Sequence, residues 1–340
     1  MFVTRQQLIE GPRDLRPHVV LLGAGASRAA FPSGDAAGRM LPLMTDLVEI
    51  VGLQPLLEKT GQPYEKEANF EAIYGRLASE PSCSKLIREI ERCIDAYFAA
   101  LSLPSQATLY DRLLVSLRPT DAVFTFNWDP FLFDAYQRNR FAVPLPEIFF
   151  LHGNVRIGMC RIHNRWGARG EHCPDCLKTL TEIPLLYPIE QKDYSSDSYL
   201  RRSWDAAKAL FAEAFTLTIF GYGAPASDKD AVELLRSAWL TRSNRKLEHI
   251  EIIDNEQRPC LYDRWAAFAP TLHYIVEPTF ERSRLSRWPR RSRESLIYPM
   301  TVGLPCEDFP LPATDSLNEL QEFSAHIARY ENQEKERVGT

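Results

Sequence analysis

The residues best suited to chemistry follow apolar runs, at the points where predicted strands end. Thr125, Asn127 and Asp129 end one such run, and His152 ends the next. Alternate positions of a strand share a face, so Thr125, Asn127 and Asp129 are expected on one side. Open α/β sheets bind ligands at the carboxyl ends of their strands, which makes these side chains candidate ligand contacts. Histidine is the natural general base near neutral pH, which makes His152 a catalytic candidate together with Asn127 and Asp129.

Two of these residues have alternative structural roles. Asp129 precedes Pro130, and an aspartate before a proline is a common helix start, so Asp129 could cap a helix as well as bind a ligand. A single histidine at a strand end is more often structural than catalytic. Asn127 has no comparable structural explanation.

A glycine-rich turn follows the first apolar run. The sequence from His18 to Ser27 reads His-Val-Val-Leu-Leu-Gly-Ala-Gly-Ala-Ser, which suits a strand buried on both faces of a parallel sheet. Gly23 and Gly25 lack a Cβ, so backbone N–H groups could approach an anion such as a phosphate closely. The same pattern also occurs in turns that bind nothing.

Two later runs end in comparable chemistry. The run 215–220 ends at Gly221, Tyr222 and Gly223, and Ser227 and Asp228 are then expected to cap a helix from about Lys229 to Leu240. The run 249–253 ends at Asp254, whose carboxylate could accept hydrogen bonds from both ribose hydroxyls.

Two close pairs of metal-binding residues lie between His152 and the run 215–220. Cys160 and His163 are separated by two residues, as are Cys173 and Cys176. Four Cys and His ligands form a closed tetrahedron around zinc, so the spacing predicts a structural zinc site. His172 competes with His163 as the fourth ligand, and free thiols are the alternative.

The elements that position these residues predict an α/β fold with a parallel sheet and helices on both faces. Helix-like apolar spacing is present in residues 41–57, 68–101 and 198–214, and the segment around Pro32–Asp35 indicates a loop folded back over the site. The length of 340 residues and the hydrophobic content of 45% allow one large domain with insertions.

Composition excludes several classes of function. The net charge of −5 argues against a dedicated nucleic-acid-binding protein, and no apolar run is long enough to cross a membrane. The first residues lack the apolar core of a signal peptide, which predicts a cytoplasmic protein, and the seven cysteines then indicate thiols or metal ligands.

The C-terminal part has a different composition. Residues Arg282 to Arg293 include six arginines and no acidic residue, and residues 317–337 resemble an amphipathic helix. We expect the basic run to be a solvated surface or a subunit contact, with a nucleic-acid patch as the minority alternative. A homo-oligomer, or a larger complex with a second protein, is predicted on this basis.

In order, these motifs resemble the sirtuin family over about residues 18–256. The resemblance implies a Rossmann-type NAD-binding domain (residues 1–280) with a helical insertion (about 36–118) and a zinc module (about 154–182), followed by a tail (281–340). It implies that Asn127 and Asp129 line the nicotinamide pocket and that His152 is the base. The implied NAD-binding set is Gly23, Ala24, Gly25, Ala26, Ser27, Thr125, Asn127, Asp129, Gly221, Tyr222, Gly223 and Asp254.

The departures from the family determine the predicted reaction. Protein-deacylating sirtuins have an arginine after the glycine-rich loop, which the stretch Phe31–Asp35 lacks, and a Phe-Gly-Glu where this chain has residues 186–192. The spacing of Pro188 and Lys192 and the turn 220–223 are more similar to sirtuin-like NAD hydrolases of prokaryotic antiphage defence. The resemblance therefore implies an NAD glycohydrolase that yields nicotinamide and ADP-ribose. The alternatives are an NAD-dependent protein-lysine deacylase and a non-catalytic nucleotide-sensing subunit.

Overall fold

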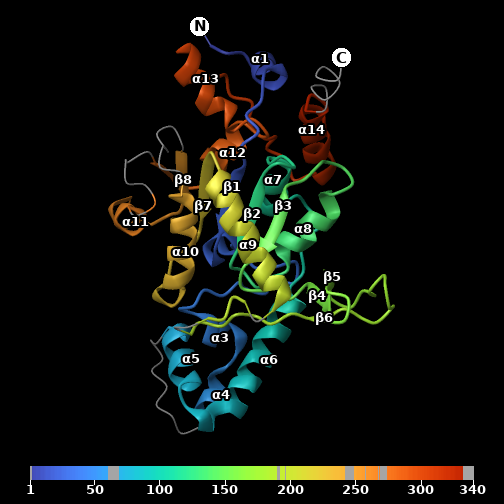
Figure 1. Cartoon of the computed structure of the whole chain (residues 1–340), viewed down its shortest axis with the longest axis vertical. Coiled ribbons are helices and arrows are strands. Elements are labelled where there is room, and N and C mark those ends of the chain that lie inside the picture. Colours follow the sequence, from blue (N-terminus) through green and yellow to red (C-terminus); the bar gives the residue numbers. More distant parts are fainter. Residues whose placement is uncertain are drawn as a thin grey trace.

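A parallel sheet forms the centre of the computed structural model, which describes residues 2–59, 69–189, 192–195, 197–241, 249–256, 258–266, 268 and 274–331 (Figure 1). In these residues the sheet has six strands in the order β3-β2-β1-β7-β8-β9, and every neighbouring pair is parallel. The strands are β1 (His18–Leu22), β2 (Ala122–Thr125), β3 (Glu147–Phe150), β7 (Thr216–Phe220), β8 (His249–Ile253) and β9 (Tyr274–Glu277). All five residues of β1, β7 and β8 are buried, as expected for strands covered on both faces.

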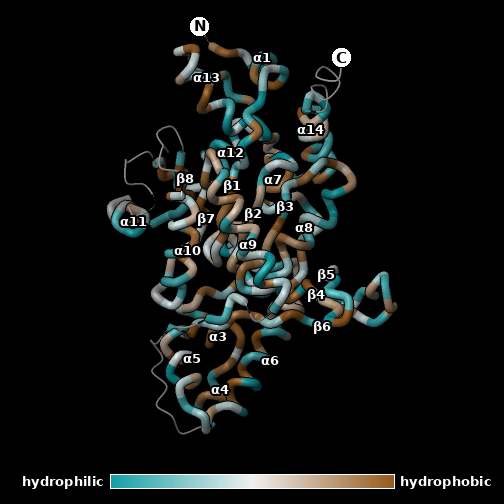
Figure 2. The backbone as a smooth tube through the Cα atoms, viewed as in Figure 1, coloured by the Kyte–Doolittle hydropathy of each residue, from teal (hydrophilic) through white to brown (hydrophobic). Residues whose placement is uncertain are grey.

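Helices cover both faces of the sheet, which confirms the predicted fold class. Val19 and Leu21 of β1 pack in one apolar cluster with α9 (Ser198–Glu213), α10 (Lys229–Trp239) and α11 (Arg258–Trp265). Val20 and Leu22 point to the other face. That face is covered by α2 (Ala24–Ala30), α7 (Leu109–Val115), α8 (Phe131–Asn139), α12 (Arg284–Arg287) and α14 (Leu317–Arg329). Hydrophobic residues gather along the central strands in Figure 2.

Two smaller parts extend from the sheet (Figure 1). One is a group of helices, with η1 (Pro81–Cys83) between the last two: α3 (Leu47–Val51), α4 (Gln54–Glu58), α5 (Phe70–Ala78) and α6 (Ser84–Ala100). The helix predicted from residue 68 begins at Phe70, because Asn69 is extended and caps it by accepting a hydrogen bond from the Glu71 amide; residues 60–68 lie outside the described part. The other part is an antiparallel sheet of β4 (Ile157–Cys160), β5 (Arg165–Ala168) and β6 (Thr181–Glu182).

The chain ends meet beyond the amino ends of the strands. The helix α1 (Arg5–Glu10) follows Val3, which forms a bridge with Cys306, and α13 (Glu294–Val302) lies nearby (Figure 1). The helix α14 ends at Arg329, and residues 332–340, where the predicted helix would continue, lie outside the described residues. No helix in the described ranges is both long and apolar enough to span a membrane.

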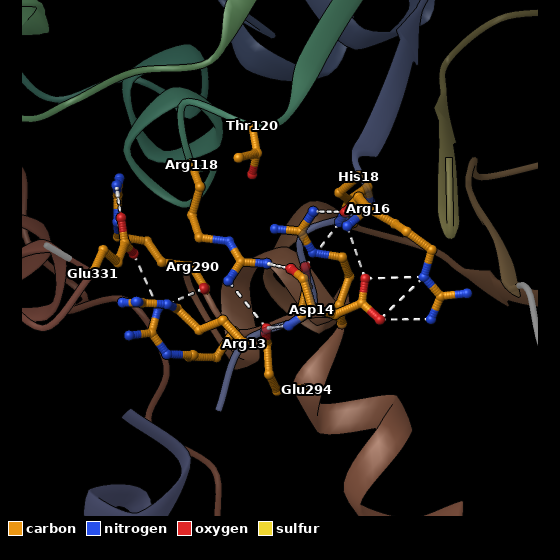
Figure 3. Close-up of polar contacts among 12 residues, drawn as sticks. Arg13, Asp14, Arg16, His18, Arg118, Thr120, Arg290, Glu294 and Glu331 are labelled. Carbon is orange, nitrogen blue, oxygen red and sulfur yellow. Dashed lines mark hydrogen bonds and ion pairs between the residues drawn. The ribbon is translucent and has the colours of Figure 1, made fainter. Parts of the chain in front are cut away.

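The prediction that the basic run is a solvated surface is wrong for three of its arginines. Arg290, Arg291 and Arg293 are at most 1% exposed. Together with Arg118 they pair with Asp121, Glu294 and Glu331, and we call these seven residues the arginine cluster. Figure 3 shows part of this cluster beside His18, at the amino ends of β1 and β2.

Backbone carbonyls complete the arginine cluster. Arg290 donates to the carbonyl of Leu117 at 2.6 Å and to Glu331 at 2.6 Å. Arg291 donates to the carbonyl of Ile9 at 2.7 Å. A guanidinium carries five N–H donors, so these arginines satisfy loop carbonyls from distant parts of the chain while their charges are paired. The partners are far away in sequence, which is why the composition of the run suggested a solvated surface.

Candidate functional site

A cavity of about 420 Å³ lies at the carboxyl ends of β1, β2, β7 and β8. The strand order reverses here. From β1 the sheet continues through β2 and β3 on one side, and through β7, β8 and β9 on the other. Dinucleotides bind at this position in doubly wound sheets. The predicted residues that line the cavity are Gly23, Ala24, Gly25, Ser27, Asn127, Asp129, His152, Gly221, Tyr222, Gly223 and Asp254, whereas Ala26 and Thr125 are not among its lining residues.

The glycines after β1 serve the contact between two turns. A Cβ on Gly23 would lie 2.6 Å from the Gly221 carbonyl oxygen, and one on Gly25 would lie 2.8 Å from the same atom. The amide of Gly25 donates to that carbonyl at 2.9 Å, and the amide of Gly23 donates to Phe220 at 3.0 Å. The amides of these two glycines are therefore used within the protein. Gly221, at a φ of 58°, lets the two turns touch.

Asn127 is held with both amide protons turned into the protein. Its Nδ2 donates to the Gly23 carbonyl and to the Ser27 Oγ, both at 2.9 Å, and lies 3.3 Å from the Tyr110 hydroxyl. The Thr125 Oγ1 accepts a hydrogen bond from the Asn127 backbone amide at 3.0 Å. Thr125 thus shapes the turn after β2 without lining the cavity.

Asp129 lines the cavity, and its side chain also contacts the start of α8. Its Oδ1 accepts a hydrogen bond from the amide of Phe131, where α8 begins, at 3.2 Å, and its Oδ2 accepts from the Ser27 Oγ at 2.6 Å. Burial raises the pKa of Asp129 to about 6, although the hydrogen bond from Ser27 opposes the shift. We call Ser27, Tyr110, Asn127 and Asp129 the polar cluster.

Tyr110 is a residue of the site that the sequence motifs did not indicate. It lies on α7, is 1% exposed, and its hydroxyl is 2.6 Å from the Ser27 Oγ. The surrounding sequence is a run of core residues with helical spacing, in which a tyrosine gives no sign of a polar role.

His152 faces a second group of buried polar residues. Its Nε2 lies 3.7 Å from the Asp228 Oδ1, and no hydrogen-bond partner is found for this nitrogen among the described residues. Lys192 donates to the same Oδ1 at 2.6 Å, and Tyr222 donates to the Oδ2 at 3.0 Å. Burial lowers the pKa of His152 to about 4; the carboxylate of Asp228 opposes this shift and Lys192 adds to it. His152 is therefore neutral at pH 7.

The role predicted for Asp228 as a helix cap is wrong. No side-chain hydrogen bond caps α10, because the Asp228 carboxylate is engaged by Lys192 and Tyr222. The side chain of Lys192 is only 1% exposed. A lysine in a loop gives no sequence signal of burial, so the resemblance singled out Lys192 but its pairing with Asp228 was not predicted.

The far end of the cavity follows β8. The Asp254 Oδ1 accepts a hydrogen bond from the Glu256 amide at 2.9 Å, and Glu256 pairs with Arg264 at 2.6 Å. All three residues line the cavity. A carboxylate at this place suits ribose hydroxyls.

Apolar side chains close the opposite end. Residues Leu41 to Met44, which follow the predicted loop, line the cavity together with Leu47 and Phe98 of the helical part and Trp128. The loop predicted to fold over the site, Pro32 to Asp35, is not among the lining residues; the segment directly after it is. Apolar walls lower the local dielectric and strengthen the electrostatic effect of the polar cluster.

The four predicted metal ligands converge. The ligand atoms of Cys160, His163, Cys173 and Cys176 all lie within 4.8 Å of one another. The Cys160 Sγ is 3.7 Å from both the His163 Nδ1 and the Cys176 Sγ. A tetrahedron with Zn–S bonds of about 2.3 Å has edges of about 3.8 Å, so the four residues fit a zinc ion. His163, and not His172, belongs to this group.

Comparisons with known proteins give matches only among solved structures. No family model and no curated protein matches the chain. A Sir2 homologue in complex with NAD is 15% identical, with a TM-score of 0.42, over 85% of this chain and 93% of that chain. A Sir2 bound to acetylated peptide is 13% identical, with a TM-score of 0.37, over 88% of this chain and 96% of that chain. A structure of a Sir2 enzyme is 13% identical, with a TM-score of 0.39, over 95% of this chain and 96% of that chain.

Proposed function

We propose that the protein is an NAD glycohydrolase. The observation that supports this most strongly is the cavity at the reversal point of a parallel sheet with the polar cluster at its base. The Asp254 carboxylate at one end suits a ribose, and the apolar walls and acceptor groups at the other suit a nicotinamide ring and its carboxamide.

The reaction breaks the bond between the ribose C1′ and the nicotinamide nitrogen. The electron pair leaves with nicotinamide, and a positive charge develops on the ribose. The Asp129 carboxylate stabilises this charge in a site with low dielectric. Asn127 orients the attacking water or the departing carboxamide.

The attacking water forms a bond from its oxygen to C1′ and loses a proton. His152 is neutral at pH 7, and its unpartnered Nε2 can accept that proton before releasing it to solvent. The products are nicotinamide, ADP-ribose and a proton, so the atoms balance without a further reactant.

A protein-lysine deacylase is the second candidate, and the state of His152 supports it. A neutral imidazole whose Nε2 has no hydrogen-bond partner in the described part of the chain can equally deprotonate a ribose hydroxyl after an acyl-lysine oxygen has attacked C1′. The two reactions differ in whether an acylated peptide is needed.

Nicotinamide release distinguishes the candidates. Purified protein is incubated with NAD, with and without an acetylated peptide. Release from NAD alone supports the hydrolase, release only with deacetylation of the peptide supports the deacylase, and binding without release supports a nucleotide-sensing subunit.

We also propose, on the basis of the sequence resemblance, a role in prokaryotic antiphage defence by NAD depletion, in a complex with a second defence protein. Phage-infected cells that express the protein should lose NAD, and cells that express His152→Ala should lose less. Light scattering tests the proposed oligomer; a monomer at micromolar concentration that is fully active would contradict it.

A further inference from the structure

Tyr110 lies on α7, a helix whose first turn is held in place by hydrogen bonds. The Thr108 hydroxyl caps this helix, and the backbone amide of Thr108 donates to the Asp111 carboxylate at 2.7 Å. Asp111 in turn accepts hydrogen bonds from Arg138 and Asn139 of α8, both at 2.7 Å. The first turn of α7, where Tyr110 lies, is therefore fixed from two sides.

The direction of each hydrogen bond in the polar cluster follows from counting protons. Ser27 has one hydroxyl proton, and it goes to the Asp129 carboxylate, which only accepts when it is ionised. The contact of 2.6 Å between Ser27 and Tyr110 must then be donated by the tyrosine. The two Nδ2 protons of Asn127 point to the Gly23 carbonyl and to Ser27.

All donors of the polar cluster are therefore used inside the protein. The Asn127 amide cannot flip, because its oxygen would then face the Gly23 carbonyl oxygen. Its Oδ1 takes no part in these hydrogen bonds, and because Asn127 and Asp129 both line the cavity, this part of the cavity offers acceptors.

We propose that Tyr110 is a positioning residue that holds Ser27 and Asn127 so that the cavity presents acceptors, and that the site thereby selects a ligand with a carboxamide over one with a carboxylate. This inference rests on the proposed use of NAD. A carboxamide brings two N–H donors to these acceptors, whereas a carboxylate brings only further acceptors and a negative charge next to Asp129. A site built to accept hydrogen bonds rejects a ligand that lacks the donors by a large factor.

The test uses Tyr110→Phe, which keeps the ring and removes the hydroxyl. Tyr74→Phe is the matched control, because the Tyr74 hydroxyl donates to Glu91 at 2.6 Å and Tyr74 does not line the cavity. The substrates are NAD and its nicotinic acid analogue. Calorimetric binding of free nicotinamide and nicotinic acid gives a readout that does not depend on turnover.

We expect the wild type to prefer the carboxamide by about a hundredfold or more in both readouts. Tyr110→Phe should reduce that preference and kcat by about tenfold each, the scale of one hydrogen bond, with a smaller change in KM. Tyr74→Phe should match the wild type in both.

The pH profile separates positioning from loss of structure. Asp134 raises the pKa of Asp129, the Ser27 hydrogen bond lowers it, and the Tyr110 hydroxyl in turn contacts Ser27. Loosening Ser27 should raise the pKa of Asp129 and move the acidic limb of the kcat profile to higher pH in Tyr110→Phe only.

Each outcome is decisive. Wild-type preference and pH profile retained in Tyr110→Phe would overturn the role of Tyr110. A wild type that cleaves no NAD but binds nicotinamide with a preference reduced by Tyr110→Phe would support the inference while contradicting the proposed function. A wild type without preference for the carboxamide would overturn the inference itself.

Discussion

Polar side chains are buried at both ends of the parallel sheet, but they are organised differently. At the amino ends, the arginine cluster closes on itself through ion pairs and loop carbonyls. At the carboxyl ends, the polar cluster leaves acceptors facing a cavity. Buried charges are tolerated when each is paired with an opposite charge, whereas groups left open in a cavity are available to a ligand. The comparison indicates that one end stabilises the fold and that the other is open to a ligand.

The largest expected effect is on stability, at the closed end. Arg290→Met leaves Glu331 with one fewer partner and the Leu117 carbonyl without its donor. We expect the free energy of unfolding to fall by about 3–5 kcal/mol, as for other broken buried pairs. Chemical denaturation measures it.

The control for this change is Arg287→Met. Arg287 pairs with Asp308 at 2.8 Å, and both side chains are more than 40% exposed. Its loss should cost about 1 kcal/mol or less. Equal losses for the two variants would contradict the distinction between a closed cluster and the surface.

At the open end, the expected effect is on turnover. Asn127→Ala removes the oriented acceptor and should lower nicotinamide release by about a hundredfold or more, with binding of NAD retained. Asn318→Ala, at an exposed position of α14, should behave as the wild type. If Asn127→Ala kept its turnover and lost only stability, the two ends of the sheet would not differ as proposed.

A third prediction concerns pH. Burial raises the pKa of Glu251, beside Arg284 and Thr218, from its ordinary value of 4.5 to about 7, with Glu277 adding to the shift. An acid whose pKa is raised on folding binds its proton more tightly in the folded state, so stability falls as pH rises from about 4.5 to 7.

The size of this loss should be on the order of 2 kcal/mol, and Glu251→Gln should remove that part of the pH dependence. Denaturation at several pH values measures it, with Glu89→Gln on an exposed turn of α6 as the control. An unchanged pH dependence in Glu251→Gln would show that Glu251 is ionised throughout.

The smallest effect on the sheet is expected from the metal site, which lies in the small antiparallel sheet. Purified protein should contain one zinc ion, and Cys176→Ser should lower zinc content and melting temperature more than turnover. Cys93→Ser, at an exposed position of α6, should change neither. Less than about half an equivalent of zinc after purification without chelators would contradict the site.

The sequence was sufficient for the parts of the fold that local pattern determines. Five apolar runs correspond to strands of the sheet, because a strand buried on both faces needs an unbroken apolar run. β9, with only one of its four residues buried, was not predicted. The residues directly after β1, β2, β3, β7 and β8 converge at the cavity, because parallel strands end at one edge.

The sequence was not sufficient where a side chain's role depends on distant partners. Tyr110 and Lys192 contribute to the site through contacts with Ser27 and Asp228, and nothing in their own neighbourhoods distinguishes them from core or surface residues. Arg290 and Arg291 were assigned to a surface because charged runs are usually solvated. Only the folded chain brings Glu331 to them.

The arginine cluster also bears on how the protein is made. Val3 pairs with Cys306, and Arg290 holds the carbonyl of Leu117, just beyond the helix that carries Tyr110. Contacts between such distant residues form late, because most of the chain must emerge from the ribosome first. We therefore expect a nascent chain that has not reached Glu331 to be sensitive to protease around α7 and unable to consume NAD. An incomplete copy of the proposed NAD hydrolase would then leave the NAD of the cell that synthesises it intact.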